Sequence, residues 1–256
     1  MLKKYISKDI TKISSAHKLN KNVSRAFVMA KNSEWTFGKK VPKKFDHHIK
    51  KSIPLYSEMH HIINNLSDFF LRKNSTCYDI GSSTGTLLRK ISSRHPTKNL
   101  NLYGVEIEKK MIQQAKNFKI KNVKINYLNK DIIKLKLSKS DLIISCYTIQ
   151  FIETRYRQSV INKIYKSLNW GGAFVLFEKI RASDARFQDI FIQLYSDLKI
   201  SNKFDEKEII NKSRSLKGVL EPFSENGNMG LLKRAGFVDI IPIMQWTCFK
   251  GFLCIK

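Results

Sequence analysis

A change in hydrophobic spacing near residue 75 separates a helical segment from a region where strand and helix patterns alternate. Before it, apolar side chains recur every three or four residues: Tyr56, Met59, Ile63, Leu66 and Phe70. This spacing, which follows Ser52 and Pro54, predicts an amphipathic helix that ends near residues 72–74. After it, the apolar run 76–80 predicts a strand, and the spacing of apolar side chains across 86–93 predicts a helix.

The alternation continues to the end of the chain. Further strands are predicted at 100–106, 123–128, 141–146, 173–177, 237–241 and 247–255, with the breaker 169–172 before the fifth. Further helices are predicted at 108–116, 155–168, 182–198, 204–219 and 229–234. The pattern predicts an α/β, Rossmann-like fold, with a mostly parallel seven-stranded sheet, helices on both faces and a helical cap inserted after strand five.

The length of 256 residues, 42% of them hydrophobic, suits one domain with an insertion. We expect a basic N-terminal arm at 1–30 and one cofactor-binding domain at 31–256, with the helical insertion at 182–220. Because the insertion follows strand five, it is placed to cover a substrate at the carboxyl ends of the strands.

The turn after the first predicted strand is built for close approach of a ligand. Asp79 lies near the end of the strand, and the turn after the strand contains small residues: Gly81, Ser82, Ser83 and Gly85. Short side chains let backbone N–H groups at the start of the next helix approach a polar or anionic ligand. Only the first and last of these residues match the glycines of a dinucleotide fingerprint, which favours a different nucleotide.

Polar residues at the ends of later strands extend this predicted site. Glu106 closes the second strand, where a carboxylate can accept hydrogen bonds from both hydroxyls of a ribose. Asp131 and Ile132 follow the third strand. There the carboxylate of Asp131 would meet the edge of an adenine, and the apolar side chain of Ile132 would meet its face. Cys146 ends the fourth strand, in the crevice where a reacting group is expected, although no partner pattern supports a cysteine nucleophile.

Composition narrows the cellular setting and the partners. No apolar run reaches the roughly 18 residues that span a bilayer, and the Lys-rich N-terminus lacks a secretory signal, so we expect a cytoplasmic protein without a membrane partner. The four cysteines form no C-x-x-C pair, and no metal site is expected. The net charge of +26 permits nucleic-acid binding but does not require it, because lysines are spread along the whole chain.

The order of the turn, Glu106 and Asp131 resembles that of class I S-adenosylmethionine-dependent methyltransferases. A closer likeness is carried by the segments 35–37, 51–56, 147–151, 163–165, 168–173 and 178–179. Together these segments resemble the carboxy-S-adenosyl-L-methionine synthases of tRNA wobble-uridine modification. The likeness runs from about residue 25 to the end of the chain. It implies a homodimer that converts S-adenosylmethionine and prephenate to carboxy-S-adenosylmethionine and phenylpyruvate.

The resemblance also implies roles for individual residues. Those that would hold S-adenosylmethionine, or its carboxylated form, are Tyr56, Gly81, Ser82, Ser83, Glu106, Ile107, Asp131 and Ile132. Two positions depart from the family: Cys146 stands where the family has Asn, and an ungapped alignment puts Ser213 where the family has the arginine that grips the new carboxylate. A shift of one residue would place Arg214 there, so Arg214 and Tyr56 are the predicted catalytic residues.

Two other functions remain open. The chain is consistent with an ordinary methyltransferase that acts on a small molecule or on RNA, because plain methyl transfer needs no cation for a new carboxylate. It is also consistent with a cofactor-binding protein without catalysis that associates with RNA through its charge.

Overall fold

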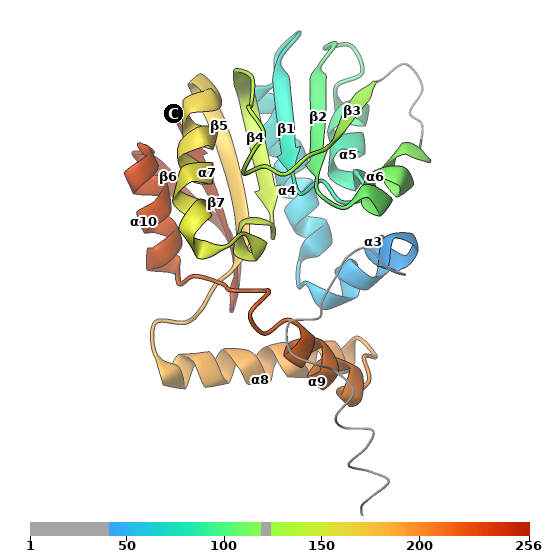
Figure 1. Ribbon diagram of the computed structural model, residues 1–256, viewed down its shortest axis with the longest axis vertical. Helices are drawn as coiled ribbons and strands as arrows, with labels where there is room; N and C mark the ends of the chain where they lie inside the picture. Colours follow the sequence, from blue (N-terminus) through green and yellow to red (C-terminus); the bar gives the residue numbers. More distant parts are fainter. Residues whose placement is uncertain (1–40, 119–123) are drawn as a thin grey trace, which may run out of the picture. The chain divides into compact units, whose positions relative to one another are not determined.

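Seven strands form one sheet in the computed structural model, which describes residues 41–118 and 124–256. The strand order is β3-β2-β1-β4-β5-β7-β6 (Figure 1). The strands are β1 (Thr76–Ile80), β2 (Asn101–Glu106), β3 (Ile125–Asn129), β4 (Ser140–Cys146), β5 (Leu168–Lys179), β6 (Asp239–Trp246) and β7 (Phe249–Ile255). The first five pair in parallel, and β7 runs antiparallel between β5 and β6. The predicted Rossmann-like, mostly parallel sheet is confirmed.

Helices connect the strands and cover both faces of the sheet. They are α3 (Val41–Ser52), α4 (Tyr56–Phe70), α5 (Thr86–Arg94), α6 (Lys109–Lys116), α7 (Thr154–Ser167), α8 (Ala185–Ser201), α9 (Glu206–Ser215) and α10 (Glu225–Ala235), with a short 3₁₀ helix, η1 (Ile149–Phe151). The predicted insertion after β5 contains α8 and α9. Residues Asp205–Val219, which hold α9, belong to a separate compact unit and are described by themselves.

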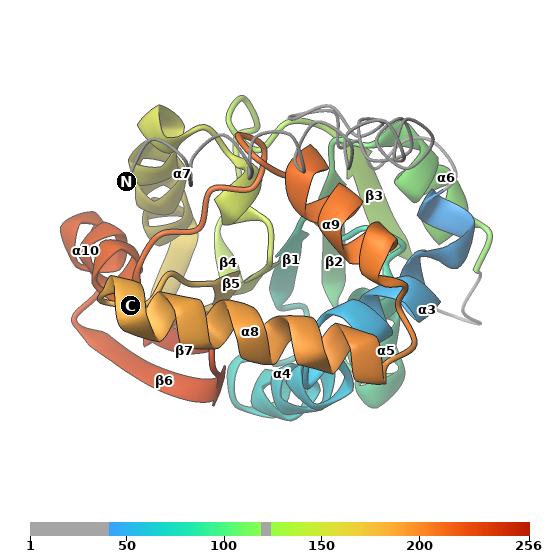
Figure 2. The ribbon, with the colours of Figure 1, turned by 90° about the horizontal axis from the view of Figure 1, so that it is seen from below.

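Two hydrophobic cores lie on opposite faces of the sheet. Helices α4 and α5 pack on one face through Met59, Ile63 and Leu88, all of which are fully buried. Helices α7 and α10 pack on the other, with Ile161 and Leu232 in the core there, and the view along the strands shows both layers (Figure 2). Because helices cover both faces, the central strands are continuous apolar runs, as is typical of parallel sheets.

Helix α3 and the start of β5 are among the places where the structure differs from the sequence-based expectation. Helix α3 was not predicted, because its apolar residues Val41, Phe45 and Ile49 are few and lie within a strongly basic segment. The segment 169–172, predicted to break the chain, is instead part of β5. Gly171 has a left-handed backbone there, with φ of 73°, and its N–H donates to the carbonyl of Lys256, so the strand continues through the irregularity.

The basic arm at 1–30 and the aromatic segment 35–37 lie outside the described residues, and the predicted domain boundaries remain a prediction. Within the described part of the chain, no helix combines the length and the hydropathy needed to cross a membrane.

Candidate functional site

The turn between β1 and α5 is fixed against the end of β2. The N–H groups of Gly81 and Ser82 both donate to the carbonyl of Val105, at 2.8 and 3.1 Å. Gly81 and Gly85 both have left-handed backbones, with φ of 79° and 74°. A Cβ at Gly81 would lie 2.8 Å from the Cβ of Thr148, so the chain after β4 packs directly on this turn.

Glu106 links the end of β2 to the same turn. Its carboxylate accepts hydrogen bonds from the N–H groups of Ser83, at 3.0 Å, and Glu108, at 2.9 Å. Burial raises the pKa of Glu106, and these N–H groups oppose the rise. The structure therefore brings Glu106 and the small-residue turn together, as the sequence predicts, and fixes the orientation of the carboxylate.

Asp79 is a buried carboxyl beside this turn. It is 3% exposed, and no cationic side chain forms an ion pair with it within the described residues. Burial, and then the nearby charge of Glu106, raise the pKa of Asp79 to about 7. A buried carboxylate without a cation is costly, so the site favours a positively charged ligand beside Asp79.

Tyr56 of α4 and Cys146 of β4 both pack against the core on the α4 and α5 face of the sheet. Burial raises the pKa of the Tyr56 hydroxyl, and the charges of Cys146, Asp46 and Asp79 raise it further. Burial also raises the pKa of the Cys146 thiol, with contributions from Asp79 and Glu178. The thiol is therefore neutral, which argues against a nucleophilic role.

The predicted adenine residues lie in the turn that follows β3. Asp131 accepts a hydrogen bond from the N–H of Ile133, at 2.8 Å, while Ile132 is 7% exposed and belongs to one of the two cores. Lys163 of α7 holds this segment by donating to the carbonyls of Ile132 and Ile133, at 2.7 and 2.8 Å. Ile107, by contrast, is 65% exposed at the end of β2, where it can cover a flat ligand face.

The segment after β4 is held by buried polar side chains. Glu178, at the end of β5, accepts hydrogen bonds from the N–H groups of Ile149 and Gln150, at 3.0 and 2.8 Å. Arg157 donates to the carbonyls of Gln150 and Ile152, at 2.9 and 2.8 Å. Burial raises the pKa of Glu178 to about 8. These bonds fix the position of η1, and with it the wall of the site formed by residues 146–148.

Arg214, the predicted catalytic arginine, lies in the last turn of α9, next to Ser213. Because α9 belongs to the separate unit, its geometry does not test the predicted contact with a carboxylate.

Asp46 is a residue of the candidate site that sequence reasoning did not predict. Its carboxylate accepts hydrogen bonds from the hydroxyls of Thr84 and Thr86, each at 3.0 Å, and so joins α3 to the start of α5. One signal was available, because Asp46 is the only acidic residue between Glu34 and Glu58 in a basic stretch. Among the residues described, no group of three His, Cys, Asp or Glu side chains is arranged to bind a metal.

These groups fit S-adenosylmethionine as a ligand. Its sulfonium and ammonium groups would neutralise the charges of Asp79 and Asp46, and its ribose hydroxyls can donate to the fixed carboxylate of Glu106. The hydroxyl of Ser82, which is part of the turn, is buried beside Gly104 of β2 and has no hydrogen-bond partner in the described part of the chain.

Comparison with known proteins identifies the family. Residues 78–174 match the family model described as "Methyltransferase domain". The chain is 36% identical to the carboxy-S-adenosyl-L-methionine synthase of Staphylococcus epidermidis over 87% of this chain and 97% of that protein. The chain belongs to the carboxy-S-adenosyl-L-methionine synthase family.

Other comparisons agree with this family. The chain is 34% identical to the carboxy-S-adenosyl-L-methionine synthase of Nautilia profundicola, over 87% of this chain and 95% of that protein. A solved S-adenosylmethionine-dependent methyltransferase of Clostridium acetobutylicum shares the fold, with a TM-score of 0.58 and 15% identity over 83% of this chain and 98% of that one. Membership of the carboxy-S-adenosyl-L-methionine synthase family confirms the predicted enzyme class, an S-adenosylmethionine-dependent transferase, and the predicted cofactor, S-adenosylmethionine.

Proposed function

We propose that the protein converts S-adenosylmethionine and prephenate to carboxy-S-adenosylmethionine and phenylpyruvate, and that the product serves tRNA wobble-uridine modification. The observation that carries this proposal is the likeness to relatives with the synthase name over 95% and 97% of their length. The cluster of Asp79, Glu106 and Asp46 around the turn supports it, because a cationic sulfonium ligand fits there.

The chemistry divides between the bound substrate and the protein. S-adenosylmethionine supplies a methyl group made acidic by its sulfonium, and that carbon takes up the carbon dioxide that prephenate releases, while the hydroxide that leaves prephenate removes the methyl proton as water. The protein's part is to position both substrates and to exclude bulk water.

Each residue of the site has a proposed role. Gly81, Ser82, Ser83 and Gly85 form the turn that holds the amino-acid part of the cofactor, with Asp79 beside its cationic groups. Glu106, Ile107, Asp131 and Ile132 hold the nucleoside. Tyr56 and Cys146 face the methyl group, and Arg214 pairs with the new carboxylate as it forms.

A second function, plain methyl transfer to a small molecule or RNA, is favoured by one observation. Cys146 stands where the resemblance implies Asn, and its thiol is neutral and partly buried. Replacing an amide by a thiol removes a hydrogen bond worth about 1–3 kcal/mol. That loss weakens binding without excluding the synthase reaction.

The test is to incubate the protein with S-adenosylmethionine and prephenate and to identify the products by mass spectrometry. We expect carboxy-S-adenosylmethionine and phenylpyruvate in equal amounts. Unchanged S-adenosylmethionine, from protein that binds it, would contradict the proposal and leave methyl transfer as the better account.

Arg214→Ala separates the carboxylation step from cofactor binding. It should abolish the carboxylated product while S-adenosylmethionine still binds, because only the product carries the extra carboxylate. Lys207→Ala, on the same helix, is the matched control and should leave product formation unchanged. Full activity of the Arg214→Ala variant would exclude this arginine as the anchor.

We also propose a cytoplasmic homodimer. The proposal follows the family resemblance and the expectation of a protein without membrane segments, and the exposed apolar side chains of α8 support the dimer.

A further inference from the structure

The turn that follows β3 is tied to the end of β2. The side-chain amide of Asn129 donates to the carbonyls of Glu106 and Ile107, at 3.0 and 2.8 Å. The N–H of Lys130 also donates to the carbonyl of Glu106, at 3.2 Å. The carboxylates proposed for the nucleoside, Glu106 and Asp131, therefore come from adjacent strand ends of one sheet. A base attached to a ribose that Glu106 holds would lie against this turn.

Asp131 has a carboxylate oxygen that a ligand can use. Its Oδ1 accepts the N–H of Ile133, at 2.8 Å, and its backbone carbonyl accepts the N–H groups of Lys134 and Leu135, at 3.1 and 2.9 Å. The Oδ2 atom accepts no hydrogen bond from the residues that the structure describes, and the side chain is partly exposed. A carboxylate oxygen can accept from the 6-amino group of adenine but not from the 6-oxo group of hypoxanthine.

Lys163 of α7 holds the same turn through its backbone. Its ammonium donates to the carbonyls of Ile132 and Ile133, the two residues directly after Asp131, at 2.7 and 2.8 Å. Hydrogen bonds from a charged donor are about twice as strong as neutral ones. The next residue of the helix, Ile164, is fully buried in the core, so Lys163 projects from a fixed point.

We propose that Lys163 is a positioning residue for the base of the cofactor. By holding Ile132 and Ile133, it sets the direction of the Asp131 carboxylate, and so the preference of the site for adenine. Without the ammonium, water would replace it on the two carbonyls, and the turn could rotate Asp131 away from the base. The inference rests on the proposed placement of the nucleoside at Glu106 and Asp131, and not on the proposed carboxylation.

The test compares two ligands by titration calorimetry, without a second substrate. One is S-adenosylmethionine, and the other is S-inosylmethionine, in which an oxygen replaces the 6-amino group of the base. We expect the wild-type chain to bind S-adenosylmethionine about 10–100-fold more tightly, because only its amino group can donate to the carboxylate. Lys163→Met should reduce this preference about fivefold or more, while the affinity for S-inosylmethionine changes less than about twofold.

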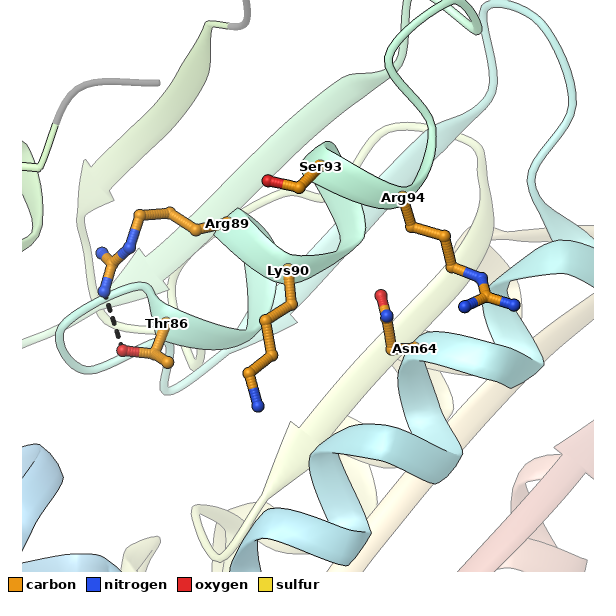
Figure 3. Close-up of a pocket in the computed structure, with 6 residues that line it drawn as sticks. All are labelled: Asn64, Thr86, Arg89, Lys90, Ser93 and Arg94. Carbon is orange, nitrogen blue, oxygen red and sulfur yellow. Dashed lines mark hydrogen bonds between the residues drawn. The ribbon is translucent and has the colours of Figure 1, made fainter. Parts of the chain in front are cut away.

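Two variants serve as controls for the lost contact and the lost charge. Lys256→Met removes a lysine that also donates to two carbonyls, those of Tyr165 and Leu168, each at 2.9 Å, but at the start of β5. Lys90→Met removes the same charge from an exposed position on the other face of the sheet, where Lys90 lines a pocket between α4 and α5 (Figure 3). Both should leave the preference within about twofold of the wild-type value.

Melting temperatures show whether each variant is folded. If Lys163→Met does not fold, Lys163→Gln takes its place, since its side chain is uncharged and one atom shorter, and we expect the same loss of preference. A merely structural role of Lys163 would weaken the binding of both ligands equally and leave the preference unchanged.

Asp131→Asn separates this inference from the placement of the nucleoside. It should bring the preference close to one, because an amide can accept from the amino group and can also donate to the oxo group. If Asp131→Asn kept the wild-type preference, or if the wild-type chain had none, the base would lie elsewhere and the inference would fall with its placement. If Asp131→Asn lost the preference and Lys163→Met kept it, only the role of Lys163 would be overturned.

Discussion

Gly81 occupies the position where backbone conformation and packing both restrict the side chain. Its φ of 79° is in the left-handed region, and the Cβ of Thr148 lies 2.8 Å from where a Cβ would be. We expect Gly81→Ala to lower the free energy of unfolding by about 2–5 kcal/mol, from backbone strain and from overpacking. The added methyl group should also displace the turn and so weaken S-adenosylmethionine binding. Urea unfolding measures the loss of stability, and titration calorimetry measures the loss of affinity.

Gly171→Ala is the matched control for this prediction. Gly171 also has a left-handed backbone, with φ of 73°, but no atom of the described residues lies within 4 Å of the place that a Cβ would take. We expect only the strain, about 1–2 kcal/mol, and an unchanged cofactor affinity. If both variants lost the same stability and the same affinity, packing against Thr148 would not be the cause.

Asp79 should make cofactor binding depend on pH. Its pKa is about 7 in the folded protein, against about 3.9 for an unperturbed Asp, so between these values the folded state holds a proton that the unfolded chain releases. The contribution of Asp79 to the stability of the free protein therefore falls as pH rises from about 4 to 7 and is constant above that.

A cationic ligand reverses this effect, because it favours the charged carboxylate. We expect S-adenosylmethionine affinity to rise by up to about tenfold per pH unit from pH 5 to 7, and then to level off. Asp79→Asn should bind more weakly and with a smaller pH dependence, as titration calorimetry can show. A wild-type affinity that is constant across this range would rule out the proposed contact.

At the scale of single residues, spacing rules predicted part of the candidate site. Gly81 and Glu106 were predictable because a turn and a strand end have fixed places relative to a parallel sheet, and the structure brings them together. The role of Asp46 was not predictable from the sequence. Its hydrogen bond with Thr84 joins residues that are 38 positions apart, and no periodic pattern in the sequence indicates such a contact.

Arg157 of α7 holds the wall of the site after β4 by donating to three backbone carbonyls. Arg157 is 2% exposed and donates to the carbonyls of Gln150, Ile152 and Glu221, at 2.9, 2.8 and 2.7 Å. Arg157→Ala leaves buried acceptors without donors, so we expect a loss of about 3 kcal/mol or more. That corresponds to a fall in melting temperature of about 6–12 °C for a protein of this size, measured by calorimetry.

Arg155→Ala provides the control from the same helix. Arg155 forms an ion pair with Glu153 at 2.8 Å, but both side chains are largely exposed. Such surface pairs contribute less than about 1 kcal/mol, so the melting temperature should fall by no more than a few degrees. Equal effects of the two substitutions would mean that the carbonyl contacts of Arg157 do not stabilise this wall.

The type of an element was predictable where the apolar periodicity was strong. Its boundaries were less predictable where tertiary contacts set them. The strands from β1 to β4 begin and end within two residues of the expected positions. Strand β5 begins five residues before its predicted start. Its first residues are held by pairing with β4 and by a hydrogen bond to Lys256. These contacts are distant in sequence, whereas the local sequence 169–172 contains two glycines, which predict a break.

For the whole molecule, the surface of α8 supports assembly into a dimer. Large apolar side chains are exposed along this helix, and Phe187, Ile190 and Leu194, 43–47% exposed, lie on one face at helical spacing. Exposed apolar patches of this kind are typical of protein interfaces. The proposed homodimer would bury this face against its copy.

Light scattering after size-exclusion chromatography tests this assembly directly. We expect a mass of twice the 29.8 kDa chain at micromolar concentration, and a mass of one chain for Ile190→Glu, because a charge buried at the interface is costly. Val238→Glu is the control, since Val238 is also an exposed apolar residue, at 88%, but lies before β6. A wild-type mass of 29.8 kDa would exclude the dimer, and a dimer that tolerates Ile190→Glu would place its interface away from α8.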